Sequence, residues 1–227
     1  MKLKNEKKAL QMFCSNDEAF HKKMTRPFIN ESYGGKVIAS DCYVMLIIDR
    51  KLLRCKYQTD KLTIPNQSGK LINKRINFSA IDEAYNQIVL EAEMEAADGK
   101  EKECPECNGT GTVDWEYTDW EGEIHYHEFD CPICDGSGER EDYVPVPTGR
   151  MLIPHGTAFV MHHTYFDASR VWQAVTGLRL MGFESMTWVG ESPQGMNWFE
   201  VCDGLTLVIM PILPSHEHQE IEIKLEE

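Results

Sequence analysis

Apolar residues near the start of the chain recur first at helical and then at strand-like spacing. Leu3, Leu10 and Phe13 fall on one face of a predicted helix over residues 3–15, and lysines lie toward the other face. Residues 43–49 are apolar at nearly every position. That pattern predicts a strand buried on both faces, near the centre of a sheet.

The rest of the chain continues with both patterns. Ser79 and Asp82 form a capping box that opens a helix, which is expected to fade near residue 98. A later helix starts at Arg170, with Asp167 or Ser169 as its cap. Further strands are predicted over residues 36–41, 52–57, 157–163, 186–189, 197–201, 205–210 and 221–225. The mixture predicts an α+β fold.

Composition narrows the class of protein. Of 227 residues, 42% are hydrophobic and 26% are charged, which is ordinary for a globular chain and unlike a disordered or fibrous one. No apolar run approaches the roughly 20 residues of a membrane span. The lysine-rich start leads into an amphipathic stretch, not the apolar core of a signal peptide. We therefore expect a cytoplasmic protein with no membrane partner.

Charge is distributed unevenly along the chain. The formal net charge is −14, yet residues 1–75 carry 16 basic and 7 acidic side chains, a balance of +9. Residues 91–142 carry 18 acidic and 3 basic side chains, a balance of −15. A basic first third beside an acidic middle predicts that the two regions meet different partners.

The acidic middle contains two copies of Cys-x-x-Cys-x-Gly-x-Gly. Two residues between thiolates allow one tight turn to present both sulfurs to a metal, and two such turns complete a tetrahedral site. The glycines allow the backbone to fold its N–H groups toward the sulfurs. One structural Zn²⁺ is predicted, on a hairpin with arms over residues 112–117 and 123–129. The ligands are Cys104, Cys107, Cys131 and Cys134, and the knuckle glycines are Gly109, Gly111, Gly136 and Gly138.

Other interpretations of these cysteines are less well supported. A Cys-Pro-x-Cys pair also suits a thiol oxidoreductase, but that chemistry uses one such pair at a helix start in a thioredoxin fold. Catalytic zinc is disfavoured because four thiolates leave no open position for water. His125 or His127 could replace a ligand, although their spacing fits one face of a hairpin strand better.

The remaining candidate residues have ordinary explanations. The four other cysteines, Cys14, Cys42, Cys55 and Cys202, are expected to be small apolar core residues. The five tryptophans are expected to pack in the protein, not to stack on bases. The pairs His162–His163 and His216-x-His218 could be metal ligands or acid–base groups, but isolated histidines are mostly surface or core residues. No nucleophile–base arrangement or phosphate-binding loop stands out, so we expect a protein that is not an enzyme.

The knuckle pattern resembles the cysteine-rich zinc domain of DnaJ-type co-chaperones. The resemblance covers only residues 103–139 and two of that family's four knuckles, and the family's His-Pro-Asp signature is absent. It implies one zinc instead of two. It also implies a zinc-stapled hairpin that could hold a peptide or a partner protein.

The segments on either side resemble halves of a bacterial sliding clamp domain (DNA polymerase III β-subunit). Residues 26–45, RPFINESYGGKVIASDCYVM, are similar to a segment that includes the clamp "AtDgyrL" pattern. Residues 165–174 and 205–212 are similar to its later helix start and its closing strand. The resemblance implies a single clamp-like domain of two helix-plus-strands halves, interrupted by a helix and the zinc hairpin. The implied parts are 1–78, 79–102, 103–142, 143–215 and an acidic tail, 216–227.

In clamps, the helices of each half line the DNA channel and carry basic residues. The resemblance therefore implies phosphate contacts from five residues of the matching helices: Lys4, Lys7, Lys8, Arg170 and Arg179. Such contacts would bind duplex DNA without reading its sequence. The alternative is that these are solvated surface charges. A closed ring would need six such domains, so a homo-oligomer is a further expectation.

Three functional hypotheses follow. The first is a clamp-like, zinc-containing accessory protein of DNA metabolism that binds DNA, a partner protein or both. The second is a DnaJ-type protein-interaction module with no DNA role, in which the acidic zinc hairpin holds the partner. The third is a thiol oxidoreductase that uses one Cys-x-x-Cys pair.

Overall fold

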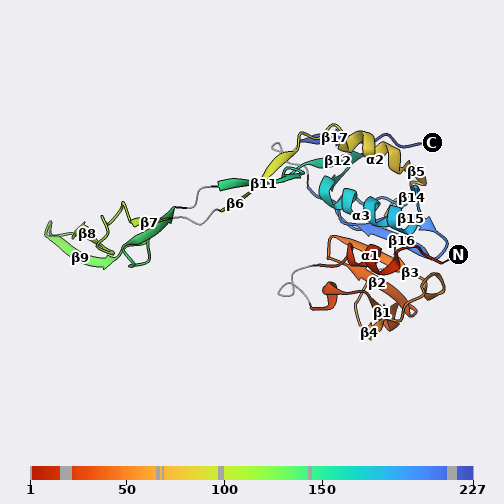
Figure 1. The fold of residues 1–227 in the computed structure, drawn as a ribbon, viewed down its shortest axis with the longest axis horizontal. Helices are drawn as coiled ribbons and strands as arrows, with labels where there is room; N and C mark the ends of the chain where they lie inside the picture. The colour runs from red at the N-terminus through yellow and green to blue at the C-terminus, as the bar shows by residue number, and fades with distance from the viewer. Residues whose placement is uncertain are drawn as a thin grey trace. The chain divides into compact units, whose positions relative to one another are not determined.

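The computed structural model describes residues 2–15, 22–64, 67, 69–96, 100–142, 145–213 and 219–226. The chain divides into two compact units. The first, here called the body, comprises Met1–Leu90 and Ile153–Glu227; the second, here called the cysteine unit, is Glu91–Leu152. Figure 1 shows the order of their elements along the chain. Both are described separately below.

The body is built on one eight-stranded sheet. Its strands, in spatial order, are β4 (Gln58–Asp60), β1 (Phe28–Asn30), β2 (Lys36–Ser40), β3 (Val44–Ile48), β16 (Leu205–Ile209), β15 (Asn197–Cys202), β14 (Ser185–Gly190) and β5 (Lys74–Asn77). β3 and β16 pair antiparallel at the centre, with Leu46 opposite Leu207. Every residue of β3 is buried, which confirms the predicted central strand.

The sheet is made from two similar runs of elements. Helix α1 (Glu6–Gln11) precedes β1–β2–β3, and helix α3 (Ala168–Met181) precedes β14–β15–β16. The two runs join where β3 meets β16. α3 contacts both α1 and the third helix, α2 (Phe78–Tyr85). The helices and the sheet share one core, in which Trp188, Phe166 and Phe199 lie ring against ring.

The opposite face of the sheet carries a smaller apolar cluster. Alternate residues point to opposite faces of a strand, so Leu46 enters the helix-side core while Met45 and Ile47 point the other way. Ile64, from the segment after β4, packs over them. A three-stranded sheet completes the body: β13 (Thr164–Asp167), β12 (Ala158–Met161) and β17 (Glu220–Glu222).

Short 3₁₀ helices connect the elements of the body. They are η1 (Lys22–Thr25), η2 (Glu31–Tyr33) and η3 (Arg50–Leu52). None of the helices in the part of the chain that the structure describes is long and apolar enough to cross a membrane.

The cysteine unit consists of three two-stranded antiparallel ladders. They are β6 (Glu91–Ala96) with β11 (Pro145–Leu152), β7 (Lys100–Glu103) with β10 (Glu139–Asp142), and β8 (Thr112–Thr118) with β9 (Ile124–Asp130). β8 and β9 are the predicted arms of the hairpin. The overall result is a sheet-rich α+β fold with few helices.

Two of the predicted helices are shorter in the structure. The first covers only Glu6–Gln11 of the predicted 3–15. The second ends at Tyr85, and residues 91–96 form strand β6 instead of continuing the predicted helix. Glu, Ala and Met favour a helix in isolation, but pairing with β11 satisfies the same backbone groups and overrides that preference.

Details of the helix starts and of one strand also differ. Helix α2 begins one residue before Ser79, with Asn77 as N-cap and no side-chain capping bond. Asp167, one of the two predicted caps, accepts a bond from the Arg170 N–H at the start of α3. The strand predicted over 52–57 is wrong, because the backbone there forms η3 and then a connection to β4.

Candidate metal centre

The four predicted ligands come together at the base of the β8–β9 hairpin. Cys104 and Cys107 belong to the turn between β7 and β8, and Cys131 and Cys134 belong to the turn between β9 and β10. Their sulfurs all lie within 4.8 Å of one another. Three of the four residues are buried, and Cys134 is partly buried.

The two knuckles have matching backbone hydrogen bonds. In the first, the Gly111 N–H donates to the Cys107 Sγ at 3.3 Å. In the second, the Gly138 N–H donates to the Cys134 Sγ at the same distance. The knuckles also bond to each other, from Cys104 N–H to the Gly138 carbonyl and from Cys131 N–H to the Gly111 carbonyl. The centre therefore has an approximate internal twofold symmetry.

Two knuckle glycines are required by close backbone approach. A Cβ on Gly111 would lie 2.4 Å from the Gly136 carbonyl oxygen, and a Cβ on Gly138 would lie 2.4 Å from the Gly109 carbonyl oxygen. Both glycines also have positive φ. The sequence spacing Cys-x-Gly-x-Gly thus reflects how closely the two turns pack.

Distances between the sulfurs match a four-thiolate zinc site. Cys104 Sγ lies 3.8 Å from Cys131 Sγ, and Cys107 Sγ lies 3.8 Å from Cys134 Sγ. Sulfurs placed tetrahedrally at the usual Zn–S distance of roughly 2.3 Å are separated by about 3.8 Å. Both short distances run between the knuckles, whereas a thiol oxidoreductase uses the two cysteines of a single motif. The donor set and these distances fit Zn²⁺.

The thiols differ in acidity. Burial would raise the pKa of Cys107, but the Gly111 N–H and the neighbouring thiols outweigh it and lower the pKa to about 7. Burial raises the pKa of Cys131 to about 11. Metal binding requires thiolates, so occupation of the site would be coupled to proton release.

The histidine alternative does not fit this geometry. The Nε2 of His125 lies 2.8 Å from the Asp119 carboxylate, at the turn end of the hairpin. Asp119, Glu123 and His125 do form a second cluster of possible ligands, but it is exposed or only partly buried. The four cysteines form their cluster without a histidine.

The two predicted DNA-contacting arginines both lie in ion pairs. Arg170 Nη1 lies 2.5 Å from the buried Asp41 carboxylate, and its guanidinium also covers the Tyr43 ring. Arg179 makes two hydrogen bonds, of 2.7 and 2.6 Å, to the Asp82 carboxylate on α2. These contacts attach α3 to its neighbours in the body.

The three predicted lysines are positioned differently. Lys7 and Lys8 lie on α1 and Lys4 lies just before it, and all three side chains are exposed. Their predicted contact with DNA stays a prediction.

The histidine pair of the body has a structural role. His162 Nδ1 lies 2.8 Å from the buried Glu191 carboxylate, which also accepts a longer bond from the Thr164 hydroxyl. These bonds tie the β12–β13 turn to the end of β14. The other pair, His216 and His218, lies outside the described residues, whereas residues 219–226 of the acidic tail are described and include β17.

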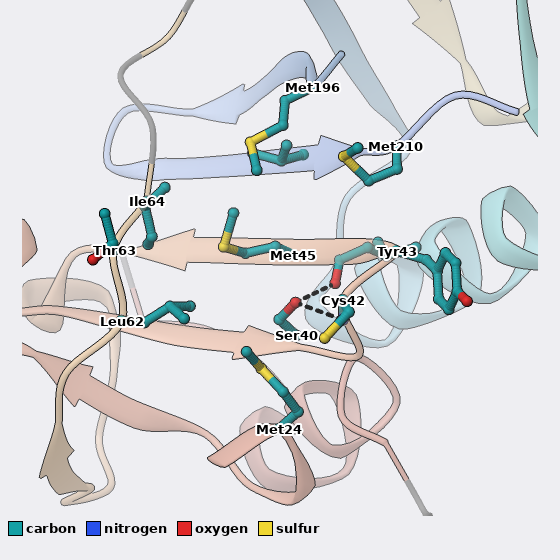
Figure 2. A pocket seen from close by; sticks show the side chains of 12 residues that line it. Met24, Ser40, Cys42, Tyr43, Met45, Leu62, Thr63, Ile64, Met196 and Met210 are labelled. Atoms are coloured by element: carbon teal, nitrogen blue, oxygen red, sulfur yellow. Dashed lines mark hydrogen bonds between the residues drawn. The ribbon is translucent and has the colours of Figure 1, made fainter. Parts of the chain in front are cut away.

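Sequence reasoning did not predict an apolar pocket on the sheet face away from the helices. Figure 2 shows Met45 on β3, Met196 just before β15 and Met210 just after β16, with Leu62 and Ile64 from the segment after β4 opposite them. The cavity measures about 170 Å³, and Ser40 and Tyr43 lie at its far end. Four methionines line the pocket, Met24, Met45, Met196 and Met210, and they give no local signal because they come from separate segments that only the fold brings together.

Some of the lone cysteines and tryptophans that were expected in the core are exposed instead. Among the lone cysteines, Cys14 is buried as expected, but Cys42 is exposed and Cys55 and Cys202 are partly exposed. Trp188 and Trp198 are buried, whereas Trp115 and Trp120 of the cysteine unit are 61% and 91% exposed. The expectation of packing residues is therefore wrong for the last two.

Comparison with known proteins gives structural neighbours only. No protein-family model matches the chain, so no DnaJ-type family is shown, and no curated protein matches it. Among solved structures, it is similar to DNA polymerase III subunit β of Pseudomonas aeruginosa, with 12% identity, a TM-score of 0.39, and coverage of 91% of this chain and 64% of that one. The sliding clamp of Caulobacter crescentus is also similar, with 8% identity, a TM-score of 0.43, and coverage of 93% of this chain and 65% of that one.

A third neighbour is the DNA polymerase III subunit β of Borrelia burgdorferi. It gives 9% identity, a TM-score of 0.43, and coverage of 92% of this chain and 62% of that one. The chain thus spans less than two thirds of the length of these solved structures. All three neighbours are sliding clamps, the class that the flanking segments resemble. At these TM-scores no property of those proteins follows for this chain.

Proposed function

We propose that this chain is a non-enzymatic binding protein whose cysteine unit folds around one structural zinc ion. The observation that supports it is the set of four sulfurs within 4.8 Å of one another, with two of the distances at 3.8 Å, contributed by two matching knuckles. A site with four protein thiolates has no free position for substrate or water, so its metal stabilises structure instead of performing chemistry. The function then lies in what the surfaces of the two units bind.

Native mass spectrometry combined with thiol titration tests the zinc site. We expect one zinc per chain, and four thiols that react only after a strong chelator is added. A Cys202→Ser variant, which removes a thiol outside the cluster, should keep its zinc. A metal-free protein whose Cys104 and Cys107 cycle between thiol and disulfide would contradict the proposal and favour the thiol oxidoreductase. The same spectrum reports any homo-oligomer.

The methionine-lined pocket supports a protein partner for the body. At about 170 Å³ it is smaller than the roughly 300–1,000 Å³ of most small-molecule sites, so it suits one or two apolar side chains of a peptide. Methionine adapts its shape to different partners at little cost. We propose that this pocket receives an apolar anchor residue from a partner protein.

Methyl-labelled methionine NMR tests the pocket directly. Short peptides with leucine or phenylalanine anchors should shift the methyl signals of Met45, Met196 and Met210. Met94 and Met151, which are about half exposed on the cysteine unit, serve as internal controls and should not shift. Equal shifts at all five methionines would mean non-specific contact and would exclude the pocket as a binding site.

A DNA-metabolism role is the second candidate. It is supported by the exposed Lys4, Lys7 and Lys8 at α1 and by the clamp resemblance of the flanking segments. We expect weak binding to duplex DNA that falls steeply with salt. Changing the three lysines to glutamine should lower the slope of log K against log[salt] by about 2–3, at roughly 0.9 per phosphate contact.

Lys51 offers the matched control for this experiment. Its ammonium already pairs with Asp49 and Asp203, so Lys51→Gln should leave the salt slope unchanged. Arg170 and Arg179 are unsuitable test positions, because removing them would leave Asp41 and Asp82 without their cationic partners. Absent or salt-independent DNA binding would leave only the protein-binding function.

A further inference from the structure

The β8–β9 hairpin has two chemically different faces. Residues alternate between the faces of a strand, and directly opposed residues share a face. The pairs Trp115–His127, Tyr117–His125 and Val113–Phe129 therefore lie on one side, here called the aromatic face. The other side, here called the acidic face, presents Asp114, Glu116, Glu128, Asp130, Tyr126 and Ile124.

The aromatic face is exposed along its length. Trp115 and Tyr117 are each 61% exposed, and Phe129 is 51% exposed. The rings do contact one another: Trp115 meets Phe129 edge-on at 5.8 Å, and Tyr117 stacks on His125 at 5.0 Å. Even with these contacts, Trp115, Tyr117 and Phe129 each remain more than half exposed to solvent. An exposed cluster of large apolar side chains usually marks an interaction surface.

The aromatic face contacts the cysteine cluster at one end. Val113, at the base of the aromatic face, packs against the buried cysteines. β8 and β9 form a sheet of only two strands, so each has an outer edge that pairs with no third strand in the described sheet. An isolated two-stranded hairpin is marginal by itself, and the metal centre would hold its face in shape.

Charge indicates what the face binds. Residues 104–138 contain nine carboxylates and no lysine or arginine. Four bound thiolates with one Zn²⁺ would add two further negative charges. DNA, RNA and acidic proteins would be repelled, whereas a cationic segment would be attracted. The guanidinium of arginine stacks on aromatic rings and pairs with carboxylates, and here both lie within one narrow hairpin.

From this combination we infer that the aromatic face of the β8–β9 hairpin binds an extended, arginine-rich segment of a partner protein. Arginine side chains lie over Trp115 and Tyr117, and the carboxylates that surround the hairpin supply long-range attraction. The open strand edges can pair with the backbone of such an extended segment. This inference rests on the proposed zinc site, because the metal centre maintains the face.

Fluorescence anisotropy with labelled nine-residue peptides tests it on the full chain. The probes are peptides that alternate threonine with arginine, with lysine or with glutamate. We expect the arginine peptide to bind most tightly, the lysine peptide several-fold more weakly and the glutamate peptide not at all. Affinity for the arginine peptide should fall as salt rises from 0.05 to 0.5 M, as for any cationic ligand on an acidic surface.

Matched variants locate the binding face. Trp115→Ala combined with Tyr117→Ala should weaken arginine-peptide binding about tenfold, at roughly two- to fivefold for each lost cation–π contact. Tyr126→Ala is the control, because Tyr126 is 67% exposed on the acidic face of the same hairpin and its loss should change affinity less than twofold. Zinc content, measured on each variant, verifies that the hairpin is intact.

The possible failures are distinguishable. Protein purified without zinc would remove the proposed function and this inference together. Zinc-loaded protein that binds the arginine and glutamate peptides equally, or loses as much affinity with Tyr126→Ala, would overturn only this inference. A zinc-loaded dimer that dissociates when Trp115 and Tyr117 are replaced would also overturn it, because a second copy of the chain would then be the occupant.

Discussion

The body and the cysteine unit bury very different kinds of side chain. In the body, Trp188, Phe166 and Phe199 lie against one another with essentially no exposed surface. In the cysteine unit, the buried apolar residues that the structure describes are Cys104, Cys107 and Cys131. The aromatic side chains of this unit that the structure describes are exposed: Trp115, Tyr117, Trp120, Tyr126 and Phe129. Hydrophobic burial can therefore hold the body together, whereas in the cysteine unit the proposed zinc ion would supply much of the stability.

Because of this difference, we expect the body and the cysteine unit to be stabilised independently of each other. The body has a continuous core shared by three helices and both halves of the sheet. The cysteine unit has three ladders of two strands each, which is below the size at which sheets are stable alone. Perturbing one source should leave the other region largely unchanged.

Metal removal should have the largest effect. Structural zinc sites contribute about 10–16 kcal/mol of apparent binding free energy at neutral pH, and that free energy is coupled to folding. A chelator, or Cys131→Ser, should therefore unfold β8 and β9 while β3 and β16 stay folded. Hydrogen exchange measured by mass spectrometry should show fast exchange confined to the cysteine unit. Loss of protection in β3 as well would show that the two units depend on each other.

A core truncation should do the reverse. Phe199→Ala removes a fully buried ring from the body and should lower the free energy of unfolding by about 3–5 kcal/mol. Zinc stoichiometry should stay at one per chain. Phe129→Ala makes the same chemical change at a half-exposed ring of the cysteine unit and should cost about 1 kcal/mol or less. Urea unfolding monitored by circular dichroism compares the two; equal losses would contradict the assignment of the core.

Close packing of the two knuckles can be tested with alanine. Gly111→Ala would place a Cβ 2.4 Å from the Gly136 carbonyl oxygen and would disturb the N–H bond to Cys107. We expect zinc affinity to fall about 10–100-fold, as for other losses of a group that orients a ligand. Gly122→Ala shares the positive φ but meets nothing within 4 Å, so it isolates the effect of backbone strain. Competition with a chromophoric chelator measures both.

The smallest effect concerns a buried carboxylate of the body. Glu6 accepts bonds from the Arg54 and Cys55 N–H groups and from the Tyr57 hydroxyl. Burial alone would raise the pKa of Glu6, but these three donors outweigh it and hold the pKa below the ordinary 4.5. Glu6→Gln should therefore cost about 1–2 kcal/mol at neutral pH, the usual penalty for an imperfectly satisfied buried bond.

The sign of its pH dependence follows from the lowered pKa. The contribution of Glu6 is fully present above the pKa of the unfolded chain, about 4.3, and is lost as pH falls through the lower pKa of the folded state. The stability difference between wild type and Glu6→Gln should be constant above about pH 5.5 and shrink below pH 4. Glu83→Gln, at an exposed position on α2, should show no such trend. Urea unfolding at several pH values measures it.

The features that sequence predicted well are those encoded over short distances. The spacing of Cys104, Cys107, Cys131 and Cys134 predicts their cluster, because each knuckle is a single turn. The continuous apolar run over residues 43–49 predicts a central strand, because only a strand buried on both faces can use it. Both patterns are local in sequence, and tertiary contacts did not change the structures that they predict.

Features that depend on distant segments were not predictable in the same way. Residues 91–96 have a helical composition but form a strand, because β11 arrives from more than fifty residues later. Asp41 and Arg170 are 129 residues apart in sequence, so their ion pair could not be anticipated. The two faces of the hairpin were in principle readable from the alternation Val113-x-Trp115-x-Tyr117, but their composition depends on the register with β9.

The pairing of β3 with β16 also constrains how the chain folds. Leu46 and Leu207 form a central contact of the sheet across most of the sequence, so the body cannot complete its core until its last strands are available. The knuckles lie within one short stretch between those two strands and need only each other and the proposed zinc ion. During synthesis the cysteine unit can therefore fold first, while the first half of the sheet still exposes an edge at β3. During that interval the chain is most vulnerable to aggregation, to oxidation of its thiols and to binding of the wrong metal.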